Sequence, residues 1–153
     1  MSLLTQINND ITEAMRAREA ARLGTLRLLK AALVNRAVER GRELDEAEAR
    51  QVVQQMVKQR RDAIDQFRAG SREDLAVKDE AEIALLMMYL PPEAGPEAIE
   101  AAVDAAIAET GASNVKDMGK VMKATLARLS GVTADGRLVS ETVKRKLTAA
   151  GER

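Results

Sequence analysis

Apolar residues recur along this chain at the three- and four-residue spacing of α-helices, and no segment shows the alternation of a β-strand. Residues typical of helix ends divide the pattern: Ser2 and Asp45 are typical N-caps, and Gly111 is a typical C-terminal residue. Pro91 and Pro92 end another helix, because proline lacks the N–H that a helix interior needs. The pattern therefore predicts about seven helices, at residues 2–18, 19–40, 45–70, 71–90, 96–111, 113–130 and 135–149.

These helices fall into two groups, so the expected fold class is all-α. Residues 1–90 hold four helices and are expected to form an N-terminal helical bundle or a set of hairpins. Residues 91–95 contain two prolines and a glycine and are the candidate linker. Residues 96–153 hold three short helices, the expected small C-terminal domain. A chain of 153 residues, 46% of them hydrophobic, can bury the cores that two small domains need.

The helix predicted over residues 19–40 has an unusually wide apolar surface. Leu29 and Leu33 belong to its main stripe, and Leu28 and Val34 widen that stripe. A surface this wide indicates contact with more than one neighbour.

The amino-acid composition excludes several kinds of chemistry. The chain has no cysteine and no histidine, which excludes disulfides, thiolate or imidazole metal ligands and histidine-dependent nucleophiles. It has no tryptophan, one phenylalanine and one tyrosine, too few aromatic rings for a base-stacking surface. We therefore predict no catalytic residue, no metal and no cofactor.

The distribution of apolar residues also bears on location. The longest purely apolar run, residues 83–90, is far shorter than the ~20 residues that span a bilayer. The first ten residues lack the basic and apolar regions of a secretory signal. The sequence predicts a cytoplasmic protein without membrane association.

Charge is balanced overall, with 24 basic and 24 acidic residues, but it is unevenly placed. Residues 14–42 contain eight bases and two acids, and residues 113–153 contain nine bases and four acids. Residues 91–112 contain five acids and no base. Two interpretations stay open: solvated helix faces paired at i,i+4, or basic faces that bind an anionic partner.

Gly119 and Lys120 lie inside a predicted helix, without the glycine spacing of a phosphate-binding loop. A glycine inside a helix costs about 1 kcal/mol relative to alanine. Gly119 therefore has either of two roles: it permits a close helix–helix contact, or it lets a partner's backbone or phosphate approach a basic helix.

Arg60 falls on an apolar stripe, seven residues after Val53, so its charge needs a partner. Asp79 or Glu82 on the next helix is the expected ion-pair partner, and a ligand-binding role is the alternative. Tyr89 is expected to pack its ring at the domain junction and leave its hydroxyl in solvent.

Several longer strings resemble a known family. They are VKQRRDAIDQF at residues 57–67, KDMGKVM at 116–122 and ADGRLV at 134–139. With shorter strings such as LGTLR at 23–27, they extend over nearly the whole chain, which resembles the YqeY-like family.

That family is similar to the C-terminal tail of GatB, a subunit of the glutamyl/aspartyl-tRNA amidotransferase. The resemblance implies an N-terminal helical bundle followed by a small three-helix domain, and a link to tRNA. The chain departs from the GatB pattern where residues 126–133 lengthen a connection. The residues that the resemblance suggests for RNA contact are Gly119, Lys120, Lys123, Lys144, Arg145 and Lys146.

Three functional hypotheses follow from the resemblance and the charge pattern. The first is a non-catalytic accessory protein that binds tRNA or another structured RNA. The second is a protein-interaction module that docks on an amidotransferase or another enzyme through residues 19–40 or 96–111. The third is a binding subunit of an amidotransferase complex, since the family carries the label of carbon–nitrogen ligase with glutamine as amido donor. No catalysis by this chain alone is expected.

Overall fold

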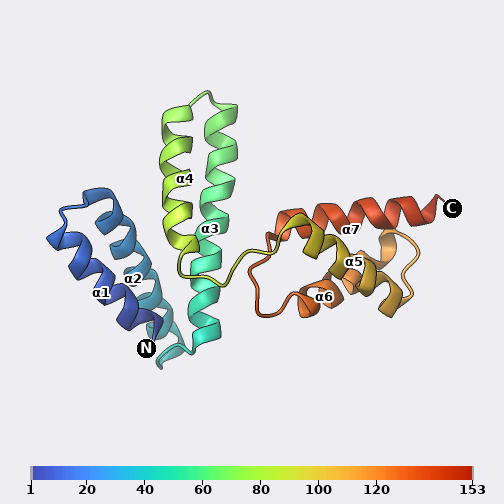
Figure 1. Ribbon diagram of the computed structural model, residues 1–153, viewed down its shortest axis with the longest axis horizontal. Helices are drawn as coiled ribbons and strands as arrows, with labels where there is room; N and C mark the ends of the chain where they lie inside the picture. The colour runs from blue at the N-terminus through green and yellow to red at the C-terminus, as the bar shows by residue number, and fades with distance from the viewer. Residues whose placement is uncertain (1, 153) are drawn as a thin grey trace. The chain divides into compact units, whose positions relative to one another are not determined.

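The computed structural model describes residues 2–152, and within them the chain is all-α, as predicted. The chain divides between Leu90 and Pro91 into two compact units (Figure 1). No strand occurs between residues 2 and 152. The helices, with one short 3₁₀ helix η1, are α1 Leu3–Arg16, α2 Ala20–Arg40, α3 Glu46–Ala69, α4 Glu73–Met87, α5 Pro96–Thr110, η1 Val115–Asp117, α6 Met118–Arg128 and α7 Gly136–Gly151.

The N-terminal unit consists of two helical hairpins. Helices α1 and α2 form one, and α3 and α4 form the other, which are the blue and the green pairs in Figure 1. They enclose one apolar core in which Ile7, Leu29, Val53 and Leu86 are completely buried, one from each helix. Burial of such side chains contributes about 1.5–3 kcal/mol each.

Helix ends in this unit follow their local sequence signals closely. The Ser2 hydroxyl accepts a hydrogen bond from Thr5 N at 3.1 Å, which confirms the predicted cap of α1. Asp45 and Glu48 form the predicted capping box at the start of α3. Gly41 ends α2 at a φ of 68°, a conformation that glycine adopts without strain.

In the turn between α3 and α4, the left-handed residue is a serine and not the glycine before it. Gly70 has a φ of −92°, whereas Ser71 takes the left-handed conformation with a φ of 58°. Arg72 N donates to Phe67 O at 2.7 Å and Ser71 N donates to Arg68 O at 3.1 Å, the bonds of a Schellman motif. Ser71 thus ends α3 and cannot cap α4.

The prediction for the Tyr89 hydroxyl is wrong. Its Oη donates a hydrogen bond to Asp10 Oδ2 at 2.5 Å, and its ring packs against the N-terminal core. A phenol that lies partly buried requires a hydrogen-bond partner, and α1 supplies it.

The C-terminal unit packs α5, α6 and α7 around a second apolar core. Ile99, Val103, Val121 and Val143 are completely buried in it. The segment before α5 runs beside Thr133, whose hydroxyl donates to Pro91 O at 2.7 Å. Thr133 N also donates to Pro92 O at 3.0 Å, and Ala94 N donates to Thr133 O at 2.7 Å.

The start of α6 also differs from expectation. A separate 3₁₀ turn, η1, precedes it, and the Asn114 side chain caps that turn by accepting from Lys116 N. Ser113 N instead donates to the Asp117 carboxylate. Leu126 is 48% exposed, although the apolar pattern of residues 113–130 predicts a buried side chain there.

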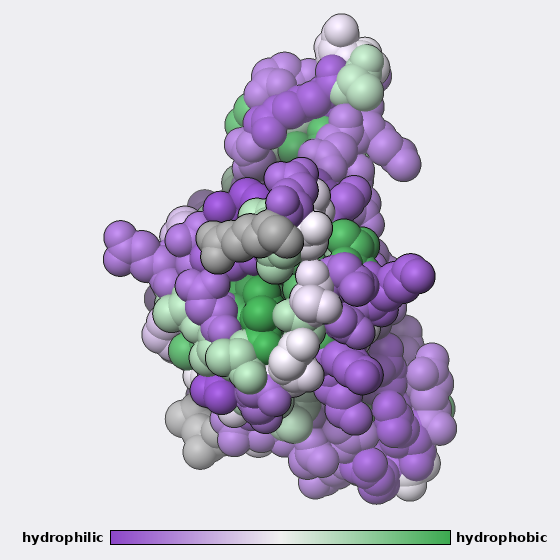
Figure 2. Space-filling view, turned by 90° about the vertical axis from the view of Figure 1, so that its right-hand side faces the viewer, coloured by the Kyte–Doolittle hydropathy of each residue, from purple (hydrophilic) through white to green (hydrophobic). Residues whose placement is uncertain are grey.

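The exterior is mostly polar. The face in Figure 2 is largely hydrophilic, with a smaller group of hydrophobic residues near its middle. Among the described residues, no helix has the length and apolar character that crossing a membrane requires.

Candidate nucleic-acid interface

A row of lysines lies on the solvent-facing side of η1 and α6. Lys116, Lys120 and Lys123 are all exposed, and they follow one another at spacings of four and three residues. Lys120 and Lys123, three residues apart on α6, share one face of that helix, and Lys116 lies exposed in the 3₁₀ turn just before it. The opposite face carries Val121 and Thr125, which are buried in the C-terminal core. The row therefore points away from the core.

No carboxylate neutralises this row. Across residues 2–152, none of the three lysine ammonium groups lies within ion-pair distance of an acidic side chain. Three exposed like charges close together in the sequence attract anions, and the attraction weakens with salt. We call Lys116, Lys120 and Lys123 the lysine row.

Gly119 lies beside the lysine row in the first turn of α6. It is exposed, and a Cβ added to it would meet no heavy atom within 4 Å. The close helix–helix contact considered for this glycine is absent from the described chain. An approaching backbone or phosphate is the role that stays open for it.

The basic run at residues 144–146 is split by ion pairs with α5. Arg145 Nη2 lies 2.5 Å from Glu100 Oε1, and Lys146 Nζ lies 2.8 Å from Asp104 Oδ1. Lys144 is exposed and forms no ion pair within the described residues. Consecutive residues on a helix point in directions about 100° apart, so Lys144, Arg145 and Lys146 do not share one helix face. The structure therefore separates Arg145 and Lys146 from the other candidates.

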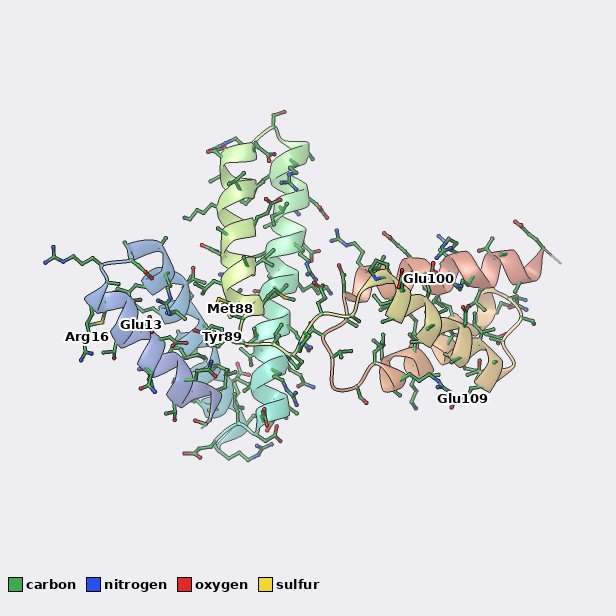
Figure 3. The ribbon with its side chains drawn as sticks, viewed as in Figure 1. Glu13, Arg16, Met88, Tyr89, Glu100 and Glu109 are labelled. Atoms are coloured by element: carbon green, nitrogen blue, oxygen red, sulfur yellow. The ribbon has the colours of Figure 1, made fainter. Side chains whose placement is uncertain are left out.

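Helix α5 supplies the opposing charge in this unit. Glu109 Oε2 of α5 lies 3.0 Å from Arg128 Nη2 of α6. Helix α5 also makes the two ion pairs with α7 through Glu100 and Asp104. Glu100 and Glu109 lie near opposite ends of α5 in Figure 3. The carboxylates of α5 thus form ion pairs with Arg128, Arg145 and Lys146 within the same unit.

Lys116 is the residue of this face that the sequence analysis missed. Its place four residues before Lys120 is the signal that could have identified it. The predicted helix at residues 113–130 does not separate η1 from α6, and the resemblance to the GatB tail points only to Gly119 and the lysines after it.

Arg60 belongs to a structural ion pair. Its Nε donates to Glu82 Oε2 at 2.8 Å, and its Nη1 donates to Met56 O at 3.2 Å. Both charged side chains are largely buried, with 14% and 19% of their surface exposed. Glu82 is one of the two carboxylates that the sequence suggested, and the pair joins α3 to α4.

Metal binding finds no support in the described part of the chain. Between residues 2 and 152, no three acidic side chains are grouped closely enough to hold an ion.

Fold and site together define a small two-unit helical protein with an unneutralised basic face on its C-terminal unit. Residues 4–147 match the Yqey-like protein family, so the chain belongs to the YqeY-like family.

Curated relatives of this chain share one name, altered inheritance of mitochondria protein 41, mitochondrial. The one from Lachancea thermotolerans is 30% identical over 105 residues, which cover 68% of this chain and 55% of that protein. The one from Eremothecium gossypii is 31% identical over 109 residues, covering 69% and 60%. The one from Pyrenophora tritici-repentis is 25% identical over 144 residues, covering 93% and 79%. The chain thus spans little more than half of the first two relatives.

The expected cytoplasmic location is contradicted by these relatives, which are named as mitochondrial proteins. The cytoplasmic prediction rested on the lack of a long apolar run and of a secretory signal. Both features are compatible with an organelle as well as with the cytoplasm, so they could not distinguish the two.

Proposed function

We propose that this chain is a non-catalytic accessory protein that binds structured RNA through its C-terminal unit. The observation that carries the proposal is the lysine row, which is exposed and lacks ion-pair partners among the described residues. Lys144 adds a further unpaired cation from α7. The choice of tRNA as the first RNA to test depends on the resemblance to the GatB tail.

The chemistry of the row favours phosphate contacts over base readout. Ammonium groups on flexible stems bind phosphates as point charges and carry little sequence information. The chain has one phenylalanine and one tyrosine, so stacking on unpaired bases contributes little. A folded RNA, whose backbone presents phosphates at fixed positions, is therefore the ligand that this face fits.

The proposal predicts a specific salt dependence. Each phosphate contact contributes roughly −0.7 to −0.9 to the slope of log K against log salt, so three contacts give a slope of about −2 to −3. Loss of one contact reduces the slope by roughly one such increment. Binding without phosphate contacts would show almost no slope.

The test is fluorescence anisotropy of labelled bulk tRNA from about 50 to about 200 mM salt. The double variant Lys120→Ala, Lys123→Ala is expected to weaken binding at least about tenfold at low salt and to flatten the slope. Its matched control is Arg145→Ala, Lys146→Ala, which removes the same charge from residues paired with α5.

The two double variants separate a local contact from a general charge effect. The proposal holds if the control binds within about threefold of the wild type while the α6 variant does not. Equal losses of tRNA affinity in both variants would mean that net charge alone explains the binding. Undiminished binding by the α6 variant would show that the lysine row is not the binding site. Far-UV circular dichroism verifies that both variants keep their helices.

A further inference from the structure

Helix α2 has a second apolar face that points into solvent. Its residues recur at spacings of four, three, four and three and all are exposed: Gly24, Leu28, Ala31, Asn35 and Val38. Val34 lies beside them, and the exposed fractions of Leu28, Val34 and Val38 are 54%, 42% and 75%. We call these six residues the outer face of α2.

The outer face is separate from the core face of the same helix. Leu26, Leu29 and Leu33 are buried, and the last two belong to the N-terminal core. Exposed apolar residues that occur singly are ordinary, but Leu28, Val34 and Val38 recur along one side of the helix, interrupted by the polar Asn35, and such a group favours an interaction surface. The wide stripe noted in the sequence is therefore two faces, one buried and one exposed.

The spacing of the outer face indicates what shape of partner covers it. Alternating steps of four and three residues are those of coiled coils, in which one helix packs side chains between those of another. Gly24 supports the same conclusion, because a Cβ added there would meet no heavy atom within 4 Å. A glycine inside a helix costs about 1 kcal/mol, and packing inside this chain does not require it. A partner helix that approaches α2 closely would require a glycine at this position.

Charge around the outer face indicates what chemistry the partner has. Helix α2 contains five basic residues and one acidic residue, and that acid, Glu39, is paired with Arg36 at 3.5 Å. Lys30 has no ion-pair partner among the described residues, and Arg27 approaches only the sulfur of Met15, at 4.0 Å. At 100° per residue, both cations lie on the Val34 side of the outer face, and Glu39 lies on its Leu28 side. Two copies of this helix in contact would bring like charges together, which disfavours self-association.

We infer that the outer face of α2 docks one amphipathic helix of a partner protein, with apolar residues along its contact side and carboxylates along the flank that meets Arg27 and Lys30. The apolar row provides the contact area, and Arg27 and Lys30 select for acidic flanks. The inference is independent of RNA binding, because it concerns other residues in the other unit.

The test is a selection of displayed helical peptides for binding to the whole purified chain. The library carries helical peptides of about four heptads, randomised at contact and flanking positions. Rounds of selection on the wild type alternate with depletion on the support without protein. An enriched peptide is then synthesised, and its affinity is measured by anisotropy. The inference predicts enriched peptides with apolar residues at four- and three-residue spacing and glutamate or aspartate beside them.

Variants of the chain locate the contact. Leu28→Glu is expected to weaken binding of the selected peptide at least about tenfold. The double variant Arg27→Ala, Lys30→Ala is expected to weaken it several-fold. Val77→Glu is the matched control, because Val77 is 53% exposed on α4, outside the outer face. Val38→Glu replaces Leu28→Glu if the latter does not fold.

Several outcomes would overturn the inference. They are a selection that enriches nothing, enriched peptides with neutral or basic flanks, and equal losses in the Val77 and Leu28 variants. A dimer in sedimentation that Leu28→Glu dissociates would assign the face to a second copy. Co-sedimentation with phosphatidylserine vesicles that depends on Leu28 would assign it to a membrane.

Discussion

The Tyr89 hydroxyl donates a 2.5 Å hydrogen bond to the Asp10 carboxylate and so joins the end of α4 to α1. In Figure 3, Tyr89 lies at the end of α4 and Glu13 lies on α1. Burial and the bond to Asp10 raise the pKa of Tyr89 above its usual value of 10.0. The contribution of Tyr89 to stability is therefore full below pH 10 and is lost as the pH rises through the raised value.

The first prediction concerns this bond. Tyr89→Phe removes the hydroxyl and is expected to destabilise the N-terminal unit by about 1 kcal/mol, because the Asp10 carboxylate loses its donor. A double-mutant cycle with Asp10→Ala, measured by urea unfolding, should give a coupling energy of about that size. A coupling near zero would mean that the bond contributes nothing in solution.

The second prediction concerns Arg60 and Glu82. Replacement of Arg60 by Met leaves a largely buried carboxylate without its partner, and we expect a loss of about 1–3 kcal/mol in the free energy of unfolding. The double variant Arg60→Met, Glu82→Leu removes both charges and should recover most of that loss. If the double variant is less stable than Arg60→Met, packing rather than charge governs this site.

The third prediction concerns acid stability at the start of α3. Hydrogen bonds from Arg42 and from Asp45 N lower the pKa of Glu48 from 4.5 to about 2. A lowered pKa contributes stability above the unfolded value, and this contribution is lost as the pH falls through 4.5 toward 2. The urea midpoint of the wild type should therefore fall more steeply over this range than that of Glu48→Gln. Glu46→Gln, in the same helical turn, is the control and should follow the wild type.

The fourth prediction separates stability from RNA binding at Gly119. Because a Cβ there meets open space, Gly119→Ala should raise the free energy of unfolding by up to about 1 kcal/mol. It should also weaken tRNA binding several-fold, because the added methyl group lies beside the lysine row. Gly24→Ala is the control: it should stabilise similarly and leave RNA binding unchanged. Tighter tRNA binding by Gly119→Ala would contradict close approach.

The fifth prediction concerns Thr125, which is completely buried and whose hydroxyl has no hydrogen-bond partner among residues 2–152. A buried hydroxyl without a partner loses its hydration and gains nothing in return. Thr125→Val keeps the shape and should raise the free energy of unfolding by about 1 kcal/mol. Thermal unfolding is the measurement, and a loss of stability would indicate that the hydroxyl has a partner in solution.

The sequence was informative wherever structure depends on neighbouring residues. The caps at Ser2 and Asp45, and the helix ends at Gly41 and Gly111, are set by groups within about four residues, so they could be predicted. The Tyr89–Asp10 bond spans 79 positions and depends on how two hairpins pack, which no local pattern specifies.

The candidate interface shows the same division. The spacing of Lys120 and Lys123 already placed them on one helix face. That Arg145 is held by Glu100, 45 positions earlier, is a property of the packed unit. Two of the three cations in the basic run are thus ion-paired within the unit, which the run itself does not indicate.

Thr133 has a consequence for how the chain can be cut and lengthened. It bonds Pro91, Pro92 and Ala94, three residues of a segment whose composition suggested a linker. A fragment that begins at Pro96 would lack these partners, so an autonomous C-terminal fragment should begin at Pro91. Extra residues inserted at the Leu90–Pro91 peptide bond, whose nitrogen carries no hydrogen, would leave every one of these bonds in place. That bond is therefore the position at which either unit can be fused to another protein with these hydrogen bonds kept.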